Sequence, residues 1–142
     1  MNTKTPPHSA PPTPPPRGTD ATPAFDPAIF TRLLTLAGPD FAAELVARYH
    51  ADLAQVQAQL RAALPPQNAP DWPTLAHASH VLIALAGTAG ATALETTARH
   101  LNHAATAQNP TATRAHHAKT LHGLAHLITF ITQITPQGHT PP

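Results

Sequence analysis

Proline constrains the fold of this chain more than any other residue type, because its positions divide the sequence into segments. Eight of the eighteen prolines lie in residues 1–23. Others stand where alanine- and leucine-rich segments begin or end: Pro27, Pro39, Pro65, Pro66, Pro110 and Pro136. Proline is tolerated in the first turn of a helix and disrupts a helix interior. The pattern therefore predicts several helices with defined starts and ends.

The first 23 residues differ from the rest of the chain in composition. They contain no large apolar residue beyond Met1. Such a segment cannot bury enough surface to offset the entropy that it loses on ordering. We predict a disordered tail with polyproline II character over residues 1–23, an ordered helical domain over residues 24–135 and a second disordered tail over residues 136–142.

Aspartate or asparagine stands just before three of the predicted helices, at Asp26, Asp71 and Asn109. Such a side chain can accept a hydrogen bond from a backbone N–H of the first turn. Together with the prolines and with Gly38, these residues predict five helices, over about residues 27–37, 39–64, 72–90, 91–107 and 110–135. The third helix is expected to end at Gly87 or Gly90.

Apolar residues recur every three or four positions in these segments, which is typical of helices that bury one face. The expected stripes are Phe41, Leu45, Tyr49, Leu53, Val56 and Leu60; Leu75, Ala78, Leu82, Leu85 and Ala89; Leu94, Ala98, Leu101 and Ala105; and His117, Leu121, Leu124, Ile128 and Ile131. No segment shows the alternation of a half-buried strand. Because the loops are short, successive helices should be antiparallel. We predict an all-α fold, an up-and-down antiparallel four-helix bundle with a short extra N-terminal helix.

Charge and cysteine content argue against several classes of function. Charged residues make up 11% of the chain and the formal net charge is +1, so no strong field would attract nucleic acid or an anionic membrane. The chain has no cysteine, which excludes disulfides and thiolate metal sites. No apolar run reaches the roughly 18–20 residues that span a bilayer, and the N-terminus does not resemble a secretory signal. We expect a cytoplasmic protein.

His80 is the candidate functional residue of the third helix. At 100° per residue it lies roughly opposite Leu82, which belongs to the apolar stripe. The face around it carries His77, Ile83, Ala84 and Gly87. Glycine inside a helix costs about 1 kcal/mol relative to alanine, so a helix that tolerates Gly87 could be keeping the surface low beside the imidazole. We expect His80 to be exposed and open to another protein.

Residues 80–91, "HVLIALAGTAGA", resemble the signature of the histidine-containing phosphotransfer (HPt) domain, H-x-L-K-G-(S/A)-x-x-x-x-G-A. The matching positions are His80, Leu82, Gly90 and Ala91, and Asp71-Trp72 stands at the expected distance upstream. The helical layout is also similar to that of the family, so the resemblance covers about residues 24–135. Two positions depart from the signature, because Ile83 replaces the usual lysine and Ala84 replaces the usual glycine.

The resemblance implies a stand-alone phosphorelay intermediate without enzymatic activity of its own. His80 would accept a phosphoryl group from a receiver-domain aspartate and pass it to another receiver. Receivers, and a hybrid histidine kinase, would dock on the face formed by His77, Ile83, Ala84 and Gly87. The family resemblance also implies a monomer that needs no cofactor, since the Mg²⁺ belongs to the receiver. Loss of the lysine should weaken stabilisation of the phosphorylated state.

Other interpretations of the same residues stay open. The domain could bind receivers or a kinase without carrying phosphate, or His80 could be an ordinary helix histidine while Gly87 and Gly90 simply end the helix. The histidine pairs 77/80, 100/103 and 122/126 have helical spacing and could bind Zn²⁺, Cu²⁺ or Ni²⁺. Glu95 and Arg99, one turn apart, are expected to form an exposed ion pair.

Overall fold

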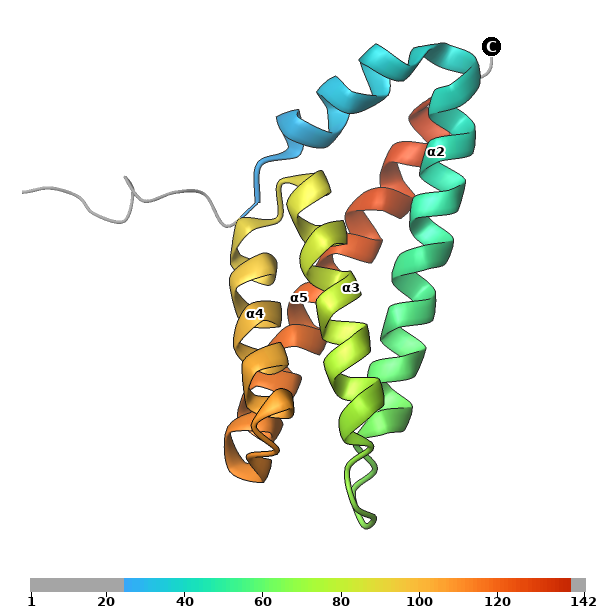
Figure 1. The fold of residues 1–142 in the computed structure, drawn as a ribbon. Helices are drawn as coiled ribbons and strands as arrows, with labels where there is room; N and C mark the ends of the chain where they lie inside the picture. The colour runs from blue at the N-terminus through green and yellow to red at the C-terminus, as the bar shows by residue number, and fades with distance from the viewer. Residues whose placement is uncertain (1–24, 139–142) are drawn as a thin grey trace, which may run out of the picture.

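The computed structural model describes residues 25–138 and contains four helices and no strand within that range. The helices are α2 (Pro27–Ala63), α3 (Trp72–Ala89), α4 (Thr92–Thr106) and α5 (Pro110–Gly138), as Figure 1 shows. The all-α fold is therefore confirmed. The predicted tail over residues 1–23 lies outside the described residues, as does the end of the second tail over 139–142.

Helix α2 contains a break at the position where the sequence predicts two separate helices. Gly38 has φ 87° and ψ 160°, and Pro39 follows it inside the same element. This φ lies in the region that only glycine adopts readily. The segment before Gly38 lies across one end of the bundle, and the segment after it runs along the bundle (Figure 1). The expected short helix is thus the first part of α2.

Polar side chains fix three of the helix starts. Asp26 and Asp71 each accept a hydrogen bond from a first-turn backbone N–H, at 3.1 and 3.2 Å, and Asn109 does the same for α5 at 3.1 Å. The expectation that the last helix ends at Pro136 is wrong, because α5 continues to Gly138. A proline this close to a helix terminus removes only one of the last hydrogen bonds.

Each helix packs against two others. Helix α3 packs against α2 and α4, and α5 packs against α4 and α2, whereas α3 and α5 make no such contact within the described range. In Figure 1 the chain reverses direction at each loop, and α3 lies between α2 and α4. The exposed residues His77, His80, Ala84 and Gly87 lie on one face of α3, which the other described helices leave uncovered.

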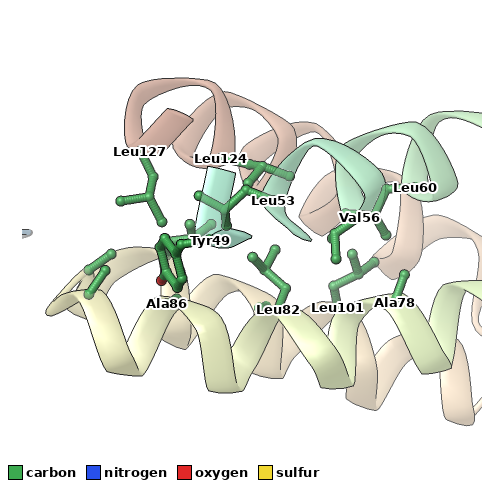
Figure 2. Close-up of a cluster of buried hydrophobic side chains, with 14 of the residues drawn as sticks. Tyr49, Leu53, Val56, Leu60, Ala78, Leu82, Ala86, Leu101, Leu124 and Leu127 are labelled. Atoms are coloured by element: carbon green, nitrogen blue, oxygen red, sulfur yellow. The ribbon is translucent and has the colours of Figure 1, made fainter. Parts of the chain in front are cut away.

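One leucine from each of the four helices lies fully buried at the centre of the bundle: Leu53, Leu82, Leu101 and Leu124 (Figure 2). The expected stripe of α4 is buried as a whole. Tyr49 donates a hydrogen bond to the Leu85 carbonyl, which joins α2 to the C-terminal part of α3. Burial raises the pKa of the Tyr49 phenol well above its ordinary value, and the nearby Asp52 carboxylate adds to the effect.

The structure places Phe41 outside the core, contrary to the expectation from the sequence. It is 66% exposed, although the spacing places it on the apolar stripe of its helix. The reason is tertiary: Tyr49 lies level with Leu85 near the end of α3, so Phe41, two turns earlier in α2, extends beyond that end. Several other stripe members are half-buried rather than fully enclosed: Leu45, Leu85, His117, Leu121 and Ile128.

Candidate functional site

His80 lies in the middle of α3 with its side chain exposed. The opposite side of the helix is occupied by Leu82, which is fully buried. Within residues 25–138 the imidazole has no hydrogen-bonding or ionic partner. Neither ring nitrogen of His80 is therefore engaged by another described residue.

The face around His80 is built mostly from small and exposed residues. His77, Ala84 and Gly87 are exposed, whereas Ile83 is half-buried and packs against the core. All four lie within two turns of His80 on the uncovered side of α3. The structure thus brings together the residues that the sequence places on one face, with Ile83 at its edge next to α4.

Gly87 is not required by the packing of the bundle. A Cβ atom built at this position would lie 3.6–3.8 Å from the carboxyl group of Glu95 on α4, which is ordinary van der Waals contact. Alanine would fit and would favour the helix by up to about 1 kcal/mol. Neither the packing nor the stability of the fold therefore requires a glycine at this position.

Gly90 has a different role from Gly87. Its φ of 78° ends α3 in a left-handed conformation. Its carbonyl accepts a hydrogen bond from the Asp26 backbone N–H at 2.9 Å, and a Cβ there would lie 2.9 Å from Cβ of Ile29. The second glycine of the signature therefore ends the histidine helix and lets the first turn of α2 pack against it.

Asp71 and Trp72, the upstream pair of the signature, fix the start of the same helix. Asp71 accepts hydrogen bonds from the backbone N–H of Thr74 at 3.2 Å and from its hydroxyl at 2.7 Å. Its own N–H donates to the Ala63 carbonyl at 2.8 Å, which holds the loop after α2. Trp72 is half-buried against the core. The outer signature residues thus set the length and position of the helix that carries His80.

A polar contact that the sequence analysis missed joins α4 to α3 beside His80. The Asn102 side chain donates to the Ala76 carbonyl at 2.8 Å and to Oγ of Ser79 at 3.2 Å. Ser79 is fully buried, and its hydroxyl donates to the Leu75 carbonyl at 2.7 Å. The contact holds the backbone on the N-terminal side of His80 against α4. An asparagine inside a helix, where it is a poor helix former, is the only sequence signal for it.

Glu95 and Arg99 form the expected ion pair on α4, with 2.7 Å between Oε2 and the guanidinium. The arginine side chain is 60% exposed and the glutamate side chain 30% exposed. The Glu95 carboxylate lies against Gly87, at the C-terminal end of the His80 face. A charged pair thus borders the candidate site on the α4 side.

The histidine pairs do not form a recognisable metal centre. The rings of His122 and His126 lie 4.7 Å apart between centroids, and those of His100 and His116 lie 5.1 Å apart. No group of three or more histidine, aspartate or glutamate side chains is placed to hold a metal ion in the part of the chain that the structure describes.

His116 on α5 is half-buried. Its Nδ1 is buried and has no hydrogen-bonding partner among the described residues. Desolvation lowers its pKa, and the nearby His100 and Lys119 lower it further. The neighbouring His117 is held by the Leu60 carbonyl, 2.8 Å from its Nε2. These two histidines belong to the packing between α5 and its neighbours.

In comparisons with known proteins, no family model, curated protein or solved structure matches this chain. None of the described helices combines the length and the apolar character needed to cross a membrane.

Proposed function

We propose that this chain is a stand-alone phosphorelay intermediate in which His80 carries the phosphoryl group. The observation that supports this proposal best is the exposed imidazole without a partner, on a helix face that keeps Gly87 although the fold does not need it. The resemblance of residues 80–91 to the HPt signature identifies the chemistry that such a histidine would perform.

The proposed step moves a phosphoryl group between an aspartate and a histidine. A nitrogen lone pair of the neutral imidazole attacks phosphorus of the receiver's aspartyl phosphate. The N–P bond forms while the bond to the aspartate oxygen breaks, and the carboxylate leaves. Phosphoryl transfer of this kind depends mainly on in-line positioning and on neutralisation of charge. The receiver supplies the Mg²⁺, and the reverse reaction passes the group to a second receiver.

Receivers, and a hybrid histidine kinase, dock on the face formed by His77, Ile83, Ala84 and Gly87. Ala84 and Gly87 leave room for the receiver's active site to approach the ring, and the half-buried Ile83 offers an apolar contact. The chain acts in the cytoplasm as a monomer and has no catalytic activity without its partner.

A second candidate function rests on a specific observation about charge. Helix α3 contains neither lysine nor arginine, and isoleucine occupies the position where the HPt signature has lysine. A bundle of this shape could bind receivers or a kinase through the same face without carrying phosphate. The two functions differ only in whether His80 becomes phosphorylated.

The deciding experiment incubates the chain with ³²P-labelled phosphorylated receivers from its host. A carrier acquires an acid-labile, alkali-stable label, and His80→Gln abolishes it. His126→Gln is the matched control, because His126 is also exposed but lies on α5, outside the docking face. Receiver binding without label on the native chain would favour the second function.

A further inference from the structure

The proposed phosphoryl acceptor has no lysine or arginine on its own helix. A phosphoryl group carries close to two negative charges near neutral pH, and contacts to charged donors are the strong ones. Since α3 supplies no lysine or arginine, a permanently charged side chain that this chain brings to His80 must come from another element.

The contacts between α3 and α4 show which part of α4 passes His80. Asn102 reaches Ser79, the residue before His80, and Glu95 lies against Gly87, two turns after His80. The two helices are therefore antiparallel, and the segment of α4 between Glu95 and Asn102 runs beside His80.

Arg99 lies within that segment and on the correct face. Residues 95, 99 and 102 are spaced by four and three, so they share one side of α4, the side that contacts α3. With a rise of about 1.5 Å per residue, Arg99 lies within about one turn of His80 along the helix axis. Packed helices have axes about 8–10 Å apart, a distance that a long arginine side chain can cross.

The other cations of the described chain are placed less favourably. Arg48 is next to Tyr49, whose hydroxyl bonds to the Leu85 carbonyl, so Arg48 is level with the C-terminal part of α3. Arg61 is two residues before Ala63, whose carbonyl bonds to the Asp71 N–H, so Arg61 is level with the start of α3. The remaining lysine and arginine residues of the described chain lie on the first part of α2 or on α5, which is not adjacent to α3: Arg32, Arg114 and Lys119.

From this placement we infer that Arg99 supplies the positive charge for a phosphoryl group on His80, in place of the lysine absent at position 83. The inference rests on the proposed function. In the structure the Arg99 guanidinium is bound to Glu95 at 2.7 Å and is largely exposed. Exposed ion pairs are weak, so a dianionic phosphoryl group competes effectively with the single carboxylate. Arg99 then moves from Glu95 to the phosphoryl oxygens.

Phosphoramidate, a small phosphoryl donor, tests this inference without a receiver. The His80 nitrogen attacks phosphorus, a new N–P bond forms and ammonia leaves. ³¹P NMR follows both the rate of phosphorylation and the pH titration of the bound phosphoryl group. We expect Arg99→Ala to lower the rate about two- to fivefold and to move the titration midpoint to higher pH, because the dianion loses its cation.

Three further variants separate charge from structure. Arg99→Lys should retain most of the native behaviour, and Glu95→Gln should raise the rate because it releases the guanidinium. Arg114→Ala removes an exposed arginine on α5 and should change neither quantity. If His80 is phosphorylated and Arg99→Ala titrates like the native chain, the inference fails while the proposed function stands. If His80 of the native chain takes no phosphoryl group, both fail.

Discussion

Gly90 and Asp26 hold the end of the histidine helix against the start of the described chain. The Asp26 N–H donates to the Gly90 carbonyl at 2.9 Å, and a Cβ atom on Gly90 would lie only 2.7 Å from the Asp26 carbonyl oxygen. A side chain at position 90 is therefore disfavoured by the left-handed backbone conformation of this residue and by a steric clash with the Asp26 carbonyl oxygen.

Gly90→Ala should lower the free energy of unfolding by about 2–4 kcal/mol, the sum of a left-handed alanine and an overpacked contact. Urea denaturation followed by circular dichroism measures this change. Stability equal to that of the native chain would show that the first turn of α2 does not pack on Gly90.

Gly87→Ala should have the opposite effect on stability. Since a Cβ at position 87 makes only ordinary contact with Glu95, the variant should gain up to about 1 kcal/mol. The added methyl group stands on the face where receivers are proposed to dock, so transfer of phosphate from a receiver should slow several-fold.

Gly123→Ala is the matched control for that variant. Gly123 is a helix-interior glycine on α5, and a Cβ there would lie 3.2 Å from Cδ1 of Leu94, so it should gain less stability than Gly87→Ala. Its rate of phosphate transfer should stay native. Equal slowing in both variants would contradict a specific role for the surface at Gly87.

Asn102→Asp tests the polar contact beside His80. The carboxylate cannot donate to Ala76 or Ser79 and would face the Ala76 carbonyl oxygen at close range. We expect a loss of about 1–3 kcal/mol in unfolding free energy. Asn102→Ala should cost less, because it removes the donor without adding a charge and favours the helix. Equal losses in the two variants would contradict this account of the contact.

His116 should make stability depend on pH. Its pKa in the folded chain is lowered by desolvation, with His100 and Lys119 adding to the effect. The unfolded chain therefore binds the proton more readily, and the contribution of neutral His116 is complete above about pH 6.5, the ordinary histidine value. This stabilising contribution is lost as the pH falls below about 6.5 and through the lowered pKa of His116 in the folded chain. His116→Gln should show a smaller decline in unfolding free energy between pH 7 and pH 5, and an unchanged decline would contradict the prediction.

Local signals in the sequence account for most of the fold. Asp26, Asp71 and Asn109 cap their helices as expected because capping depends only on residues two or three positions apart. The spacing of apolar residues wrongly predicts that Phe41 is buried, because its exposure depends on where α3 ends relative to α2. A repeat within one helix carries no information about the length of its neighbour.

The candidate site also combines features that local sequence signals predict with one that they do not. The exposure of His80 follows from its phase relative to Leu82, and the Glu95–Arg99 pair follows from helical spacing; both predictions are confirmed. The contact between Asn102 and Ser79 could not be predicted, since it depends on the register between two helices. That register results from the packing of the whole core.

His80 is the proposed phosphoryl acceptor, and mapping of the phosphorylated residue shows whether it carries the group. The native chain is incubated with phosphorylated receivers of its host, digested under alkaline conditions that preserve phosphohistidine, and analysed by mass spectrometry. We expect a single modified histidine at position 80, which is absent in His80→Gln and retained in His126→Gln, a variant outside the docking face. Phosphate on another histidine, or an unmodified His80 with every receiver of the host, would contradict it.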